Sequence, residues 1–224
     1  MYLYITEKTP QQKADLWVKT KSEYKDMCQA LFESLDAYIA DSGKKNRGER
    51  ELVSSLLIKS VFHLRSFGEI SKIPKAFKKD DQGKPYFEDF DISFNIAHSD
   101  GLVVIAYGKN EKIGVDTECE IEEKRAANLS LRFPMIASLK TEKCPEKIEA
   151  YVMGHNGEFT AVDLDFSGED FTEKWTVAEA LMKCDGRGFS TLSSLERLAE
   201  KMKSCTFIYE CEKGKNYISV ATKE

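Results

Sequence analysis

The 224-residue sequence predicts an α+β protein, in which helices and short antiparallel strands are grouped rather than strictly alternating. Apolar residues make up 42% of the chain and charged residues 32%, which is typical of a globular protein that buries a core. Residues 11–40 and 49–66 carry apolar side chains at helical spacing. Several later segments are short, rich in β-forming residues and separated by turn-forming residues, as expected for hairpins.

The first part of the chain is expected to hold one strand and two helices. Residues 1–6 alternate weakly between apolar and polar side chains, which predicts a short strand. The helical segments 11–40 and 49–66 are separated by residues 41–48, a segment rich in charge that is interpreted as a loop. The run Asp-Asp-Gln-Gly-Lys-Pro at 80–85 predicts a turn, because glycine permits positive φ and proline fixes its own.

A small sheet is expected to follow. Residues 92–97, 102–107 and 113–118 predict strands. The short polar segment 108–112 separates the last two, so we expect these two strands to form an antiparallel hairpin.

The second part repeats this mixture of helices and hairpins. Asn156-Gly157 between two β-rich runs is a strong hairpin signal. The expected helices are 122–130, 171–184 and 193–203, and the expected strands are 151–153, 159–164, 206–210 and 217–222.

Composition argues against several classes of protein. A net charge of −5 disfavours a nucleic-acid partner, because phosphate backbones require concentrated Lys and Arg. The six cysteines show no C-x-x-C spacing, and no stretch approaches the ~18 apolar residues of a membrane helix. The first ten residues lack the pattern of a signal peptide. We therefore expect a cytoplasmic protein without a membrane partner.

Asp116 and Glu118 form the first candidate site. Both carboxylates project from one face of the predicted strand 113–118, because alternate side chains share a face. Adjacent carboxylates repel each other unless a cation lies between them, and Mg²⁺ prefers such oxygen ligands. The alternative is a strand end whose acids are simply solvated.

Glu179 and Lys183 form the second candidate site. They lie four residues apart on one face of the predicted helix 171–184. Trp175, Ala178 and Met182 follow a neighbouring stripe that is expected to pack inward. Glu179 is thus a candidate metal ligand or base and Lys183 a phosphate ligand, whereas the alternative is an exposed ion pair of ~0.3–0.5 kcal/mol.

His98 and Ser99 form the third candidate site. They follow a predicted strand, and loop residues on a rigid sheet are frequent binding groups. Both side chains can donate to phosphate oxygens, although a partly buried structural histidine is equally consistent with the sequence. His63 and His155 are interpreted as structural or incidental.

Taken in order, these segments resemble the Sfp-type family of 4′-phosphopantetheinyl transferases. The similarity runs from about residue 50 to residue 190 and depends on several motifs rather than one. The matching segments are Gly-Lys-Pro at 83–85, Asn-Ile-Ala-His-Ser at 95–99, Ile-Gly-Val-Asp-Thr-Glu at 113–118, and 175–183, together with the helix at 50–59 and Gly-Arg-Gly at 186–188.

The resemblance implies a fold and a reaction. It implies two similar α+β lobes in a pseudo-twofold arrangement, residues 1–110 and 111–224, with coenzyme A between them. The implied reaction is Mg²⁺-dependent transfer of phosphopantetheine from coenzyme A to a serine of an acyl or peptidyl carrier protein, releasing 3′,5′-ADP, by a monomer. The implied residues are Asp116, Glu118 and Glu179 for the metal, Glu179, Lys183 and Asp116 for catalysis, and Arg50, Lys84, Pro85, His98, Ser99 and Lys183 for coenzyme A.

Some positions depart from the family pattern. Ala178 stands where the family usually has lysine, Ala97 replaces a common Ser or Thr, and residues 134–170 match little of the pattern. The rival interpretations are therefore a family member that binds coenzyme A or a carrier protein without transfer, a hydrolase of the coenzyme A pyrophosphate, and an unrelated α+β binding module. The identity of the base also stays open between Glu179 and a metal-bound water.

Overall fold

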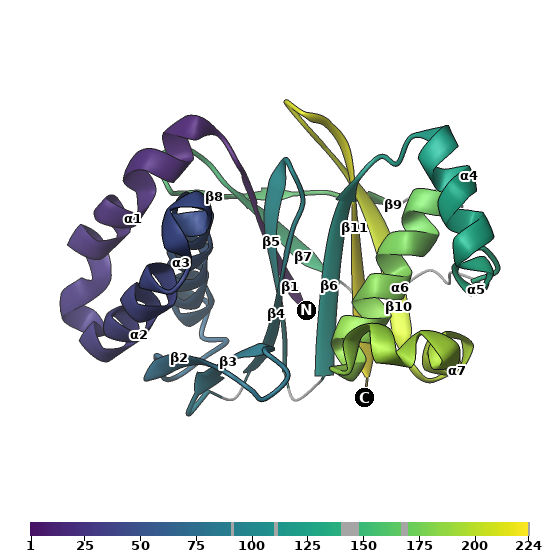
Figure 1. The fold of residues 1–224 in the computed structure, drawn as a ribbon. Helices are drawn as coiled ribbons and strands as arrows, with labels where there is room; N and C mark the ends of the chain where they lie inside the picture. Colours follow the sequence, from purple (N-terminus) through teal and green to yellow (C-terminus); the bar gives the residue numbers. More distant parts are fainter. Residues whose placement is uncertain (91, 110–111, 140–147, 167–169, 224) are drawn as a thin grey trace.

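The described part of the protein is built around two larger β-sheets that pack face to face, each covered on its outer side by helices (Figure 1). The structure is a computed structural model that describes residues 1–90, 92–109, 112–139, 148–166 and 170–223. The predicted α+β class is confirmed. No helix among the described residues is long and apolar enough to cross a membrane.

The first sheet has the strand order β4-β5-β1-β7-β8. The pairs are antiparallel except for β1 and β7, which run parallel. Strands β7 and β8 follow residue 111, so this sheet draws on both sides of the expected lobe boundary. Its strands are β1 (Tyr2–Glu7), β4 (Ile92–His98), β5 (Leu102–Lys109), β7 (Glu149–Met153) and β8 (Phe159–Val162).

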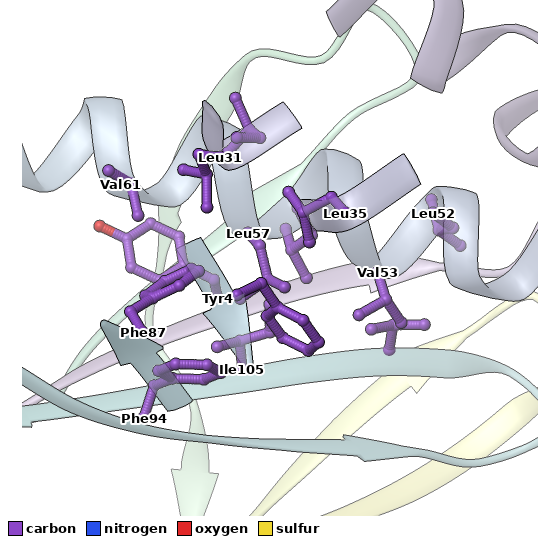
Figure 2. Close-up of a cluster of buried hydrophobic side chains, with 14 of the residues drawn as sticks. Tyr4, Leu31, Leu35, Leu52, Val53, Leu57, Val61, Phe87, Phe94 and Ile105 are labelled. Carbon is purple, nitrogen blue, oxygen red and sulfur yellow. The ribbon is translucent and has the colours of Figure 1, made fainter. Parts of the chain in front are cut away.

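Helices α1 (Pro10–Tyr24), α2 (Gln29–Ala40) and α3 (Gly43–Ser66) cover the outer face of this sheet (Figure 1). Figure 2 shows side chains of α2 and α3, such as Leu35 and Leu57, packed on Tyr4, Phe94 and Ile105 of the sheet. This cluster is the larger core of the molecule.

Two expectations for these helices are wrong. The expected helix 11–40 is interrupted by a 3₁₀ turn, Lys25–Met27, so α1 and α2 are separate helices. The expected loop 41–48 instead lies mostly in α3, which begins at Gly43. Lysine and arginine are good helix formers, and Arg47 forms an i,i+4 ion pair with Glu51 at 2.9 Å, so the charge of this segment is the solvated face of a helix.

The second sheet has the order β6-β11-β10-β9, with all pairs antiparallel. Helices on its outer side form a second core cluster around Val177 and Leu181. The strands are β6 (Lys112–Cys119), β9 (Asp165–Phe166), β10 (Lys203–Cys211) and β11 (Gly214–Lys223), and the helical elements are α4 (Glu123–Arg132), α5 (Pro134–Ala137), α6 (Phe171–Asp185), a 3₁₀ segment (Gly188–Ser194) and α7 (Leu195–Lys201).

The expected hairpin between strands 102–107 and 113–118 is wrong. Strand β5 pairs with β4 and β1 in the first sheet, whereas β6 pairs with β11 in the second. The two strands face each other across the interface between the sheets, where Val104 lies in one apolar cluster with Ile113 and Val115. Strand β5 is almost entirely buried, because helices cover one face of its sheet and the second sheet covers the other. A two-stranded hairpin would leave one of these faces in water.

The other hairpins are confirmed. Strands β7 and β8 pair antiparallel around Asn156-Gly157, and β10 pairs with β11 at the end of the chain. The turn at 80–85 connects β2 (Ala76–Lys79) to β3 (Pro85–Glu88) in a separate two-stranded sheet.

Candidate active site

The site begins with a close approach of strand β6 and helix α6. A Cβ atom on Gly114 would lie 2.1 Å from the carbonyl oxygen of Ala180 and 2.4 Å from the amide nitrogen of Cys184. Only glycine therefore permits this contact. Asp116 and Glu118 share the face of Gly114, since alternate strand residues point the same way. The contact thus brings both acids to α6.

Helix α6 is fixed at both ends. Asp170 caps its N-terminus by accepting from the Glu173 amide at 2.9 Å, and the Thr172 hydroxyl accepts from the Ile121 amide at 3.0 Å. At the other end Gly186 adopts the left-handed conformation, with φ of 89°, and its amide donates to the Met182 carbonyl. The helix therefore presents one defined face to β6.

Three acids meet where α6 crosses β6. Asp116, Glu118 and Glu179 each offer a carboxylate oxygen, and these atoms lie within 4.8 Å of one another. The Lys183 ammonium donates to Asp116 Oδ1 at 2.6 Å. The structure thus brings together the four residues that the sequence named for metal binding and catalysis.

The electrostatics of this acidic cluster favour a bound cation. Burial raises the pKa of Glu179 to about 7, and the charges of Asp116 and Glu118 act in the same direction against Lys183. Burial also raises the pKa of Glu118, with Asp116 adding to the effect. Asp116 Oδ2 is buried and has no hydrogen-bond partner within the described part of the chain. Lys183 alone therefore leaves the cluster with excess negative charge and an unused ligand atom.

His98 lies at the end of β4, beside this cluster. Burial lowers the pKa of its imidazole and Glu49 raises it. Lys8 and Lys183 lower the same pKa further, and Asp116 raises it. His98 Nε2 lies 3.6 Å from Glu49 Oε1, and the nearly buried ammonium of Lys8 pairs with the same carboxylate. The histidine thus lies next to the Lys8–Glu49 ion pair and within electrostatic range of Asp116 and Lys183.

The other residues expected to bind coenzyme A have partners within the protein. Arg50 donates to the Tyr38 carbonyl, stacks on the Tyr38 ring at 4.5 Å and lies 3.4 Å from Asp41. Ser99 donates to Asn216 Oδ1 at 2.9 Å. The Lys84 ammonium contacts main-chain carbonyls of β6 and α6, and Pro85 starts β3. Their role in coenzyme A binding stays a prediction.

Several residues that shape the site were not singled out from the sequence. Asn95 is buried on β4 and its side-chain oxygen accepts from the Val115 amide of β6 at 3.0 Å, which links the two sheets next to Asp116. Arg125 of α4 lowers the pKa of Glu118, and Glu49 lies beside His98. Among these residues, Gly114 could have been identified from the sequence, because a glycine inside a predicted strand often marks a close contact with another backbone segment.

Ala178 is fully buried on α6. It belongs to the apolar cluster that includes Ile136 of α5 and Leu139. The expected inward stripe is confirmed for Ala178 and Met182, while Trp175 is half-buried against Phe133. The alanine that departs from the family pattern is thus a packing residue here.

Comparisons with known proteins give a consistent family name, although no family model matches the chain. A putative 4′-phosphopantetheinyl transferase of Haemophilus influenzae is 27% identical over 62% of this chain and 53% of its own length. The 4′-phosphopantetheinyl transferase gsp of Aneurinibacillus migulanus is 29% identical over 62% of this chain and 49% of its own length. The 4′-phosphopantetheinyl transferase Sfp of Bacillus subtilis is 25% identical over 75% of this chain and 61% of its own length. The matched region spans about half the length of these relatives, and it confirms the resemblance of this chain to the 4′-phosphopantetheinyl transferase family.

Proposed function

We propose that this chain is an enzyme that transfers the 4′-phosphopantetheine group of coenzyme A to a serine of an apo carrier protein and releases 3′,5′-ADP. The observation that carries the proposal is the convergence of Asp116, Glu118 and Glu179 within 4.8 Å, beside Lys183. Strand β6 contributes the first two acids, and helix α6, about 60 residues later in the sequence, contributes Glu179 and Lys183. The names of the three relatives support the same reaction.

The acidic cluster fits a divalent cation such as Mg²⁺. Its donors are all carboxylate oxygens, which hard cations prefer, and the buried Asp116 Oδ2 has no partner among the described residues. Asp116, Glu118 and Glu179 would hold the ion. When bound, Mg²⁺ would neutralise the diphosphate of coenzyme A and the charge that develops on it during transfer.

The protein residues would then position the diphosphate and move one proton. Lys183 and His98 would donate to phosphate oxygens. The serine oxygen forms a bond to the β-phosphorus as the bond from that phosphorus to the 3′,5′-ADP oxygen breaks. The serine proton must be accepted, and Glu179 is our candidate because its carboxylate lies within the acidic cluster where the diphosphate would bind.

The remaining assignments follow from the resemblance. The chain would form two similar lobes in a pseudo-twofold arrangement, residues 1–110 and 111–224, with β7 and β8 of the second lobe extending the sheet of the first and coenzyme A between the lobes. Arg50 would approach the 3′-phosphate, Pro85 the adenine and Ser99 a phosphate, whereas the Lys84 ammonium, also expected beside the adenine, donates to two main-chain carbonyls. We propose a monomer that acts on acyl or peptidyl carrier proteins in the cytoplasm.

Intact mass spectrometry of carrier proteins tests this function. The chain is incubated with coenzyme A, Mg²⁺ and a panel of apo carrier proteins, and one carrier should gain the mass of a phosphopantetheinyl group. Glu179→Gln should abolish the gain while coenzyme A still binds. Full activity of that variant would exclude Glu179 as the base.

The same experiment separates the rival interpretations. Coenzyme A binding without transfer to any carrier would favour a non-catalytic binding protein. Release of 3′,5′-ADP in the absence of carrier would favour a hydrolase. A chain without Mg²⁺-dependent affinity for coenzyme A would be an unrelated binding module.

A further inference from the structure

The turn between β2 and β3 holds Lys84 in a defined position. The side chain of Asp80 accepts from the amides of Gln82 and Lys84 at 2.9 and 2.8 Å, and the Asp80 amide donates to the Lys84 carbonyl at 3.0 Å. Gly83 takes the left-handed conformation that this turn requires, with φ of 82°. The Gly-Lys-Pro segment thus fixes the backbone from which the Lys84 side chain extends.

The Lys84 ammonium contacts two elements of the second sheet layer. Its Nζ atom donates to the Ile113 carbonyl of β6 at 3.1 Å and to the Lys183 carbonyl of α6 at 3.2 Å. The side chain is half-buried. The hairpin is therefore connected through one lysine to both elements that carry the acidic cluster.

The contact with α6 satisfies a helix end. The last four carbonyls of a helix have no intrahelical partner, and that of Lys183 is one of them, since α6 ends at Asp185. A cation at a helix C-terminus also interacts favourably with the helix dipole. Lys84 therefore acts as a C-terminal cap supplied by a distant hairpin.

The two contacts lie directly beside the residues of the candidate site. Ile113 precedes Gly114, where β6 and α6 touch, and the side chain of Lys183 is the one that donates to Asp116. A lysine ammonium has three donors, and two of those of Lys84 are directed at main-chain carbonyls. We propose that Lys84 is a positioning residue, which holds the end of α6 on β6 so that Lys183 faces Asp116.

The expected effect of Lys84 on kcat rests on the proposed transferase function. Its expected effect on the end of α6 does not. Hydrogen exchange of the last turn of α6 tests the structural part, with Lys84→Met and the matched control Lys78→Met. Lys78 is an exposed lysine of the same hairpin and pairs with Glu88. Lys84→Met should raise amide exchange in this turn by about tenfold, and Lys78→Met should leave it unchanged. Equal exchange in both variants would overturn the proposal, whether or not the chain is a transferase.

Kinetics with a double variant test the functional part. Lys84→Met should lower kcat by about tenfold and change the KM for coenzyme A by less than about twofold, and it should cost almost nothing further in a Lys183→Met background. A raised KM with unchanged kcat would show that Lys84 contacts the donor itself, and additive losses in the double variant would show that Lys84 does not act through Lys183; either result would overturn the proposal. Lys84→Arg, which keeps the charge and the donors, should recover most of kcat, and it serves as the readout if Lys84→Met does not fold. If the wild-type chain transfers nothing, the proposed function fails, and the exchange experiment still decides the role of Lys84.

Discussion

The Lys183 ammonium lies 2.6 Å from Asp116 Oδ1, although the two residues are 67 positions apart in the chain. Asp116 is buried, whereas a third of the Lys183 side chain is exposed. Burying a carboxylate without a partner is costly, so Lys183 compensates one of the charges of the acidic cluster. A cation at this cluster and Lys183 would thus share the task of neutralising Asp116.

The first prediction concerns this ion pair. Lys183→Met should destabilise the protein by about 1–3 kcal/mol, because it leaves Asp116 buried beside two other acids while solvent screens part of the loss. Mg²⁺ should restore part of the thermal stability, since it would supply the missing positive charge. Thermal unfolding with and without Mg²⁺ measures both effects. Lys201→Met, on an exposed position of α7, is the control.

An unchanged midpoint for Lys183→Met would contradict the pairing of Lys183 with Asp116. Absence of stabilisation by Mg²⁺ in both wild type and variant would contradict a metal site at these acids.

The second prediction concerns the contact between Gly114 and α6. Gly114→Ala should destabilise the protein by about 3 kcal/mol or more, because the new methyl group would overlap the Ala180 carbonyl, which is backbone and cannot turn away. Urea unfolding gives the free energy. Gly154→Ala places its methyl group near the flexible end of Asn156 and should cost less than about 1 kcal/mol. Similar values for the two variants would mean that β6 and α6 do not touch at Gly114.

Local patterns predicted much of this fold and the candidate site. The helix 171–184 and the strand 113–118 were both found from short-range signals, and each places two functional side chains on one face. That the two elements meet depends on tertiary packing. The motif resemblance supplied that expectation, and Gly114 provides the physical reason.

The wrong hairpin arose from a non-local contact. A short polar link between two strands favours a hairpin, and the sequence holds no signal that β6 pairs instead with β11, about a hundred residues later. The parallel pairing of β1 with β7 is equally non-local. The helical start of α3 was missed because a highly charged segment is compatible with both a loop and a solvated helix.

The third prediction concerns Asn95, which links the two sheets. Asn95→Ala should destabilise the protein by about 1–3 kcal/mol, because the buried Val115 amide loses its acceptor. Because Val115 precedes Asp116, divalent-metal affinity measured by calorimetry should fall as well. Asn128→Ala, on the exposed surface of α4, should alter neither quantity. A stable variant with normal metal affinity would show that this hydrogen bond does not support the site.

The fourth prediction concerns Glu179 and the dependence of stability on pH in the absence of metal. Its pKa is raised from 4.5 to about 7 in the folded protein, so the folded state keeps a proton that the unfolded chain releases. Stability from this group is fully present below pH 4.5 and is lost as the pH rises to about 7. Glu179→Gln removes that loss, and with a chelator present it should be about 1–3 kcal/mol more stable than wild type at pH 8 but nearly equal to it at pH 4.5.

Urea unfolding of both proteins across this pH range provides the measurement, and Glu196→Gln on exposed α7 is the control for a general effect of charge. Mg²⁺ should reverse the order at pH 8, because a bound cation would stabilise the wild-type carboxylate more than the amide. A Glu179→Gln variant that is less stable than wild type at pH 8 in chelator would show that the Glu179 carboxylate does not destabilise the metal-free protein. In a site built for a cation, the metal-free carboxylates repel one another, so replacing one of them by an amide should stabilise the folded state until the cation binds.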